Sequence, residues 1–114
     1  MRILILCILI TFCSWSAFPK AGYRADSILI KRVIALNDSG VFCWKKKEFT
    51  KALNLFSTAL SLAEKDGLKD QVASELNNIG LVYYSQCEYA RCLDYYNRSI
   101  TVLRQTGDSM KIAQ

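Results

Sequence analysis

Five cysteines are the side chains best suited to covalent or metal chemistry in this 114-residue chain. Cys7 and Cys13 lie in an apolar N-terminal stretch, which leaves Cys43, Cys87 and Cys92 in the rest of the chain. An odd number of thiols cannot form a closed set of disulfides within one chain, and three thiols without a histidine cannot complete a four-ligand zinc site. We therefore expect these cysteines to act as small, buried apolar side chains.

Other groups that would indicate catalysis are missing from the sequence. The chain has no histidine, which removes the usual general base and the common form of a serine or cysteine triad. Its five glycines stand singly, so the sequence contains no glycine-rich loop that could cradle a phosphate. The sequence therefore predicts a protein that is not an enzyme and that uses neither a cofactor nor a metal ion.

A basic segment raises the alternative of nucleic-acid or acidic-lipid binding. The net charge is +5, and its densest part is Lys45–Lys47 with Lys51, next to Trp44 and Phe49. Basic residues interleaved with aromatic residues can bind nucleic acids. Here both aromatic residues fall at positions expected in a helix core or groove, and lysines at the end of a helix interact favourably with its dipole. We interpret the segment as a solvated helix end and expect no nucleic-acid partner.

Residues 1–17 have the pattern of a secretory signal peptide. Arg2 precedes an apolar run, and the small residues Ser14 and Ser16 stand at positions −3 and −1 of a cut after Ser16. The run is shorter than the roughly 20 residues that span a bilayer. We expect cleavage near Ser16 and export to the periplasm or the exterior, with an uncleaved membrane anchor as the alternative. Residues 18–26 are expected to form a linker.

The rest of the chain nearly repeats itself at an offset of 40 residues, without a gap from Leu36 to Ala113. Periods of this size indicate stacked supersecondary units, none of which can bury its apolar face alone. The identical pairs are Leu36/Leu76, Asn37/Asn77, Gly40/Gly80, Glu48/Glu88, Leu53/Leu93, Gly67/Gly107 and Ala73/Ala113.

Apolar residues within each copy recur at spacings of three and four, which is typical of helices. The first helix is expected to follow a cap at Asp26 or Ser27, and the second is expected to end at Gly67. The sole proline is Pro19, and no window alternates as a strand would. The sequence is therefore predicted to be all-α. The expected apolar faces are Leu29, Val33, Leu36, Gly40 and Cys43; Phe49, Ala52, Leu53, Phe56, Ala59, Leu60 and Ala63; Leu76, Ile79, Gly80 and Tyr83; and Tyr89, Cys92, Leu93, Tyr96, Ser99, Ile100 and Leu103.

Each copy resembles the tetratricopeptide repeat, a helix-turn-helix unit of about 34 residues. The resemblance implies an α-solenoid of antiparallel helix pairs, in which Gly40 and Gly80 let the paired helices approach closely. The implied domain covers residues 27–108, with repeats at about 33–66 and 73–106, and residues 109–114 would begin a truncated third repeat. The matching residues are Leu36, Gly40, Phe49, Ala52, Phe56 and Ala59 in the first copy and Leu76, Ile79, Gly80, Tyr83, Tyr89, Cys92 and Tyr96 in the second.

The 40-residue period is longer than that of the common repeat. It is similar to the repeats of kinesin-light-chain-like adaptors, of Gα-binding spindle adaptors and of bacterial sensor and regulator proteins. The additional residues would lengthen either the helices or the connections around Gly67 and Gly107. The resemblance implies a protein-binding module, which we expect to be the extracytoplasmic N-terminal part of a larger bacterial signalling protein. The alternatives are a membrane-anchored scaffold or assembly factor and a truncated open-reading-frame fragment without independent function.

The resemblance also implies that the first helix of each repeat lines a concave surface for a protein or an extended peptide. Asparagine side chains can hydrogen-bond a peptide backbone, and aromatic rings supply apolar area. The carboxylate clamp of some family members has a lysine and an asparagine where this chain has Asn37 and Val41, so that type of binding is not expected. The expected surface residues are Asn37, Val41, Trp44, Asn77, Asn78, Leu81 and Tyr84.

A third repeat that is cut short would leave an apolar face uncovered. The residues expected on this face include Leu81, Tyr84, Ile100 and Leu103. Exposed apolar patches of this kind promote association. The sequence therefore predicts self-association through the C-terminal face of the array.

Overall fold

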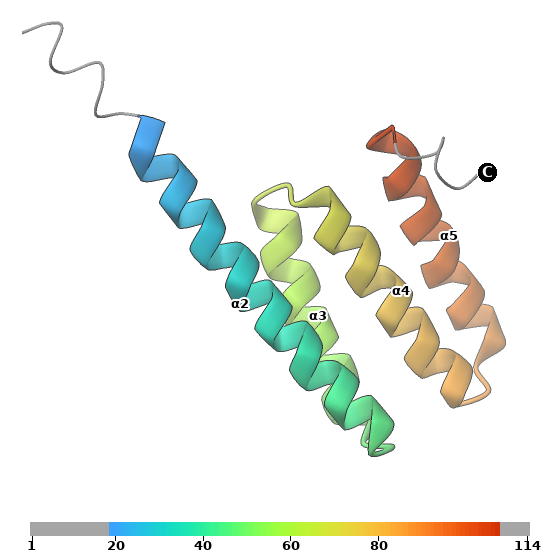
Figure 1. The fold of residues 1–114 in the computed structure, drawn as a ribbon. Coiled ribbons are helices and arrows are strands. Elements are labelled where there is room, and N and C mark those ends of the chain that lie inside the picture. The colour runs from blue at the N-terminus through green and yellow to red at the C-terminus, as the bar shows by residue number, and fades with distance from the viewer. Residues whose placement is uncertain (1–18, 108–114) are drawn as a thin grey trace, which may run out of the picture.

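The computed structural model describes the backbone of residues 19–107 and the side chains of residues 27–107. This part of the chain forms four helices: α2 (Pro19–Lys45), α3 (Phe49–Lys65), α4 (Lys69–Ser85) and α5 (Tyr89–Gln105). The same residues contain no strand. Figure 1 shows two antiparallel helix pairs, α2 with α3 and α4 with α5, and α2 extends past the other helices at its N-terminal end. The predicted all-α architecture is confirmed.

The first helix begins earlier than the sequence predicted. We expected a linker over residues 18–26 and a cap at Asp26 or Ser27, but α2 already begins at Pro19. Proline suits the first helical position because its fixed φ matches the helix and its missing N–H would have no partner there. The expected signal peptide, residues 1–17, and the expected start of a third repeat, residues 109–114, lie outside the described residues.

The helices follow a strict register along the chain. Helices α3, α4 and α5 have 17 residues each, and they begin 20 residues apart, at Phe49, Lys69 and Tyr89. The connections between successive helices are the short segments 46–48, 66–68 and 86–88. The additional residues of the 40-residue period therefore lengthen the helices and not the connections.

Each connection reverses the chain in the same way. Its middle residue has a positive φ, which is 61° at Lys47, 66° at Gly67 and 62° at Cys87. The next residue donates its N–H to a carbonyl five residues back, as Leu68 does to Ala63 over 2.9 Å. This pattern is the Schellman motif, which satisfies carbonyl groups at the end of a helix. Glycine adopts this conformation readily, whereas lysine and cysteine take it at a cost of about 1–2 kcal/mol.

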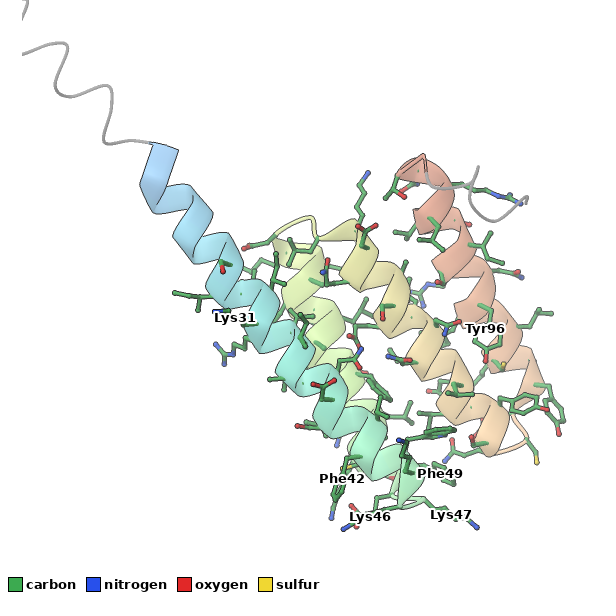
Figure 2. All side chains as sticks on the ribbon, viewed as in Figure 1. Lys31, Phe42, Lys46, Lys47, Phe49 and Tyr96 are labelled. Atoms are coloured by element: carbon green, nitrogen blue, oxygen red, sulfur yellow. The ribbon has the colours of Figure 1, made fainter. Side chains whose placement is uncertain are left out.

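The two helices of each repeat approach closely at a glycine. A Cβ atom added to Gly40 would lie 2.5 Å from the nearest ring carbon of Phe56, and one added to Gly80 would lie 2.8 Å from the ring of Tyr96. The aromatic ring of the second helix therefore rests directly on the backbone of the first. Figure 2 shows Tyr96 on α5 beside α4. The predicted role of these glycines in close helix packing is confirmed.

The apolar core joins the two repeats across three helices. Buried side chains from α2, α3 and α4 form one cluster, and a second cluster lies closer to the other end of α3 and α4. Alanines on α3 let α4 pack closely, because small side chains shorten the distance between helix axes. The first cluster contains Val33, Ala59, Ala63, Val72 and Leu76, and the second contains Ala52, Phe56, Ile79 and Val82.

The three described cysteines differ in their surroundings. Cys92 is buried, as expected, and Cys43 is half-buried. Cys87 is exposed in the turn between α4 and α5, so the prediction of a buried side chain is wrong for this residue. The turn conformation places Cys87 outside the helix pair, where the apolar spacing of a helix no longer applies. Among the described residues, no helix has the length and apolar character needed to cross a membrane.

The close approach at Gly40 gives a direct test of the packing. We expect Gly40→Ala to lower the free energy of unfolding, because overpacking costs about 1–3 kcal/mol and exceeds the gain in helix propensity of up to about 1 kcal/mol. Ser39→Ala is the control, since Ser39 is exposed on the same helix and the change removes only the hydrogen bond from its Oγ to the carbonyl of Ala35. Urea denaturation would measure both variants. If Gly40→Ala were as stable as Ser39→Ala, the ring of Phe56 would not rest on this glycine.

Candidate functional site

Helices α2 and α4 carry all seven residues that the sequence predicts for a concave surface. Asn37, Val41 and Trp44 lie on α2, and Asn77, Asn78, Leu81 and Tyr84 lie on α4. These two helices are the first helices of the two repeats. They contact each other along one side of the array, and α3 and α5 form the other side. The groove between α2 and α4 is therefore the candidate functional site.

Asn37 is held by a residue that the sequence analysis did not select. Its side-chain Nδ2 donates a hydrogen bond of 2.8 Å to Oε1 of Glu75 on α4. Glu75 is almost completely buried, with 1% of its surface exposed, although it carries a carboxyl group. The sequence contained a signal for this residue: Glu75 falls between Val72 and Ile79 on the apolar side of its helix, where a charged residue is unusual.

The surroundings of Glu75 change its acidity. Burial raises the pKa of its carboxyl group above the ordinary value of 4.5, because the charged form loses its hydration. The side-chain amides of Asn37 and Asn78 act in the opposite direction and lower the pKa, but burial is the larger effect. Oε2, the second carboxyl oxygen, is buried and has no hydrogen-bond partner among the described residues. The α2–α4 contact thus contains a carboxyl group that is half satisfied.

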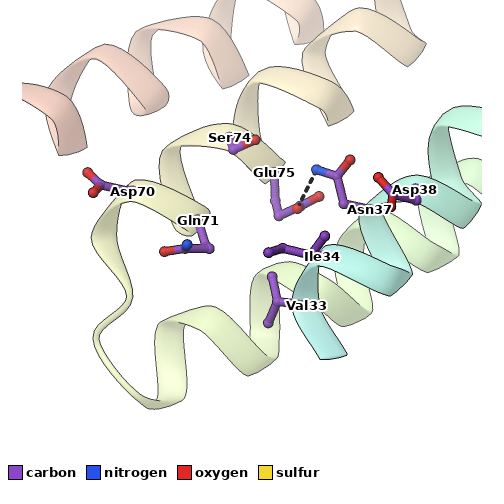
Figure 3. Close-up of a pocket in the computed structure, with 8 residues that line it drawn as sticks. All are labelled: Val33, Ile34, Asn37, Asp38, Asp70, Gln71, Ser74 and Glu75. Carbon is purple, nitrogen blue, oxygen red and sulfur yellow. Dashed lines mark hydrogen bonds between the residues drawn. The ribbon is translucent and has the colours of Figure 1, made fainter. Parts of the chain in front are cut away.

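A pocket of about 280 Å³ opens next to this carboxyl group. Figure 3 shows Glu75 pointing from α4 toward α2, with Ile34 and Asn37 on the facing helix. Two further carboxylates, Asp38 on α2 and Asp70 on α4, are exposed at the edge of the pocket. The site therefore combines apolar side chains with three acidic groups. Its lining residues are Val33, Ile34, Asn37, Asp38, Asp70, Gln71, Ser74 and Glu75.

A second hydrogen bond closes the other end of the groove. The indole Nε1 of Trp44 donates to Oγ of Ser85 over 2.9 Å, and that hydroxyl donates in turn to the carbonyl of Leu81. Trp44 is half-buried and packs against the second core cluster, together with Val41. Asn37 and Trp44 thus connect α2 to α4, and their side-chain N–H donors have partners on that helix.

The aligned residues of the second repeat lie in a different environment. Asn77 is exposed, and Tyr84 has 56% of its surface exposed, with its ring edge-on to Tyr89 at a centroid distance of 5.6 Å. Asn78 and Leu81 are half-buried. The difference follows from position in the array. Asn37 and Trp44 face α4, whereas no described helix lies after α5 to face Asn77 and Tyr84. Asn77 and Tyr84 are therefore the predicted site residues that are most accessible to a partner.

The C-terminal side of the array carries an apolar stripe along α5. Leu93 is 61% exposed and Ile100 is 41% exposed, while Leu103 is half-buried. These residues are spaced by seven and three positions, so they lie on one face of the helix. Ile100 and Leu103, with Tyr84, belong to the face that the sequence predicted to remain uncovered, whereas Leu81, also expected there, is half-buried.

The basic segment at the end of α2 makes local contacts. Lys45 lies in the last turn of the helix, and the Lys46 ammonium lies 4.3 Å from the ring centroid of Phe42. Lys51 pairs with Glu48 over 3.1 Å, and both side chains are exposed. Figure 2 shows Phe42, Lys46 and Lys47 together at this end of the molecule. These contacts agree with the interpretation of a solvated helix end.

Comparison with known proteins identifies the repeat. A family model described as tetratricopeptide repeat matches residues 32–109, which is more than half of the chain. Searches of curated proteins and of solved structures gave no significant match. The family match spans the four helices from the middle of α2 onward and includes both sides of the α2–α4 groove.

The raised pKa of Glu75 makes stability depend on pH. The folded state binds the proton more tightly than the unfolded state, so this contribution to stability is complete below the ordinary pKa of 4.5 and is lost as the pH rises through the higher folded value. Glu75→Gln removes this ionisation and keeps an acceptor for Asn37. We expect the melting temperature of the variant, relative to the parent, to rise between acid and neutral pH, by about 4–8 °C for each kcal/mol.

The control for this prediction is Glu64→Gln, because Glu64 is exposed on α3. Its melting temperature should follow that of the parent across the same pH range. The buried amide that Glu75→Gln introduces would add a constant offset, so the pH dependence of the difference is the quantity to measure. A difference between Glu75→Gln and the parent that does not change with pH would contradict the buried, proton-binding carboxyl group.

Proposed function

We propose that this chain, which belongs to the tetratricopeptide repeat family, is a module that binds an extended peptide of a partner protein along the α2–α4 groove. Members of the family generally bind proteins or peptides, and the fold is generally not catalytic. We propose that this chain likewise catalyses no reaction. The observation that carries the proposal is the groove itself, which has a pocket between α2 and α4; Asn77 and Tyr84 extend this surface along the side of α4 that no described helix covers.

The groove offers the types of contact that an extended peptide needs. The exposed amide of Asn77 can both donate and accept hydrogen bonds with a peptide backbone. Tyr84 and the half-exposed Ile34 supply apolar area for side chains of the peptide. Hydrogen bonds from Asn37 and Trp44 to α4 hold the two helices together, so less ordering would accompany binding. The groove would therefore bind a peptide on a surface that is already formed.

Export is the second part of the proposal. The support is the sequence of residues 1–17, with one basic residue, a short apolar run and small residues before the cut. The module would then act outside the cytoplasm, as the N-terminal part of a bacterial signalling or regulatory protein. A membrane-anchored scaffold is the alternative, and it differs in keeping the N-terminal segment. Self-association through the exposed face of α5 stays a prediction.

Selection from a random peptide library displayed on phage would test the groove. We expect selected peptides, once synthesised, to bind the parent chain and to bind Asn77→Ala and Tyr84→Ala at least about fivefold more weakly, since an interface anchor contributes more than about 1 kcal/mol. Asn54→Ala is the matched control, because Asn54 is an exposed asparagine on α3, away from the groove. Failure to enrich any peptide, or equal losses for Asn54→Ala and Asn77→Ala, would refute groove binding.

Mass spectrometry of the chain expressed in a bacterial host would test export. We expect a mature mass that corresponds to cleavage near Ser16, recovered from the periplasm or the medium. A full-length mass in the membrane fraction would support the anchored scaffold. A full-length mass in the cytosol would contradict both the cleaved and the anchored forms.

A further inference from the structure

We propose that the pocket between α2 and α4 binds the basic side chain, in particular an arginine guanidinium, of the peptide that occupies the groove. This inference rests on the proposed peptide binding and adds the chemical class of residue that the site selects. Three features of the pocket support it: an unpartnered buried acceptor, an excess of negative charge and an apolar floor.

The buried acceptor is Oε2 of Glu75. It has no hydrogen-bond partner among the described residues, while Oε1 of the same group accepts from Asn37. A buried polar atom without a partner is destabilising, so native structures usually satisfy it with a ligand, an ion or water. Glu75 is one of the residues that line the pocket, so a ligand there lies next to this carboxyl group.

The charge of the pocket favours a cation. Asp38 and Asp70 stand at its edge, and neither forms an ion pair with another described residue. By contrast, Glu48 and Glu88 pair with Lys51 and Arg91 at the starts of α3 and α5. The chain as a whole has a net charge of +5, so a pocket with three carboxyl groups differs from the rest of the molecule. Such a local field attracts a positive ligand and repels an acidic one.

The geometry favours an organic cation over a metal ion. In the described part of the chain, no group of three or more acidic, cysteine or histidine side chains lies close enough together to hold a metal ion. A guanidinium presents five N–H donors in a plane, and this arrangement is suited to hydrogen bonding with carboxyl groups.

The apolar part of the pocket suits the rest of an arginine side chain. Val33 is 1% exposed and forms the floor, and Ile34 is 49% exposed beside it. The methylene stem of arginine can pack on such surface while its charged end reaches the carboxyl groups. The pocket volume of about 280 Å³ is well above the roughly 15 Å³ that a single water molecule needs. An arginine of the peptide would thus fill the space next to Glu75.

The test uses methylguanidinium as the probe and N-methylurea as its neutral analogue. Both would be titrated at low salt into the full chain labelled with ¹⁵N, and the amide signals of Asn37, Asp38 and Ser74 would be followed. We expect saturable shifts with methylguanidinium and no saturation with N-methylurea. Glu75→Gln and Asp38→Asn should each weaken binding about threefold to fivefold, whereas Asp94→Asn, an exposed carboxylate on α5, should not.

Two outcomes would overturn the cation site. The first is the absence of methylguanidinium shifts in the groove of the folded chain, and the second is an equal response in Asp94→Asn and Asp38→Asn. Peptides from the phage selection separate this inference from groove binding itself. If they bind but lose no affinity when arginine is replaced by the neutral isostere citrulline, the cation site is refuted and peptide binding stands. If methylguanidinium binds but no peptide is selected, the pocket accepts a cation, but peptide binding and the assignment of the pocket to an arginine of a peptide are both refuted.

Discussion

The hydrogen bond from Asn37 to Glu75 is the interaction on which the candidate site depends. It joins α2 to α4, with 2.8 Å between Nδ2 of Asn37 and Oε1 of Glu75. The bond lies directly beside the apolar cluster that contains Val33, Val72 and Leu76. A carboxyl group in such a position is unfavourable, and a well-packed apolar side chain there would commonly be as stable or more stable. The proposed binding role would account for an acid next to this pocket, whereas a contribution to stability would not.

The regular geometry of the array explains why the groove exists at all. Helices α3, α4 and α5 have 17 residues and start 20 residues apart, and each connection turns through one left-handed residue, so successive helices are antiparallel. Gly40 and Gly80 bring the two helices of each repeat together, with Phe56 and Tyr96 resting on them. The α2–α4 contact lies on the other side of this arrangement, where it is bridged by the hydrogen bonds of Asn37 and Trp44.

Much of this fold could be predicted from the sequence, because the 40-residue period and the helical spacing of apolar residues are local signals. The close approach at the glycines was implied by the resemblance to the tetratricopeptide repeat. The start of α2 was wrong because Pro19 was interpreted as part of a linker, although proline also suits a first helical turn. Glu75 was missed because its charge suggested exposure, and burial of a charged side chain depends on the helix packed against it. Asn37 and Trp44 were correctly placed on the inner helices, but their bonds to Glu75 and Ser85 depend on how the repeats stack.

The central claim is that Glu75 is a buried acid in the groove, and its own titration tests this most directly. The side-chain carboxyl carbon of Glu75, assigned with the help of Glu75→Gln, can be followed by ¹³C NMR as the pH is changed. We expect a pKa above the ordinary value of 4.5, because burial disfavours the charged form more than the amides of Asn37 and Asn78 support it. A pKa at or below 4.5 would show a solvated or fully satisfied carboxylate and would contradict the claim.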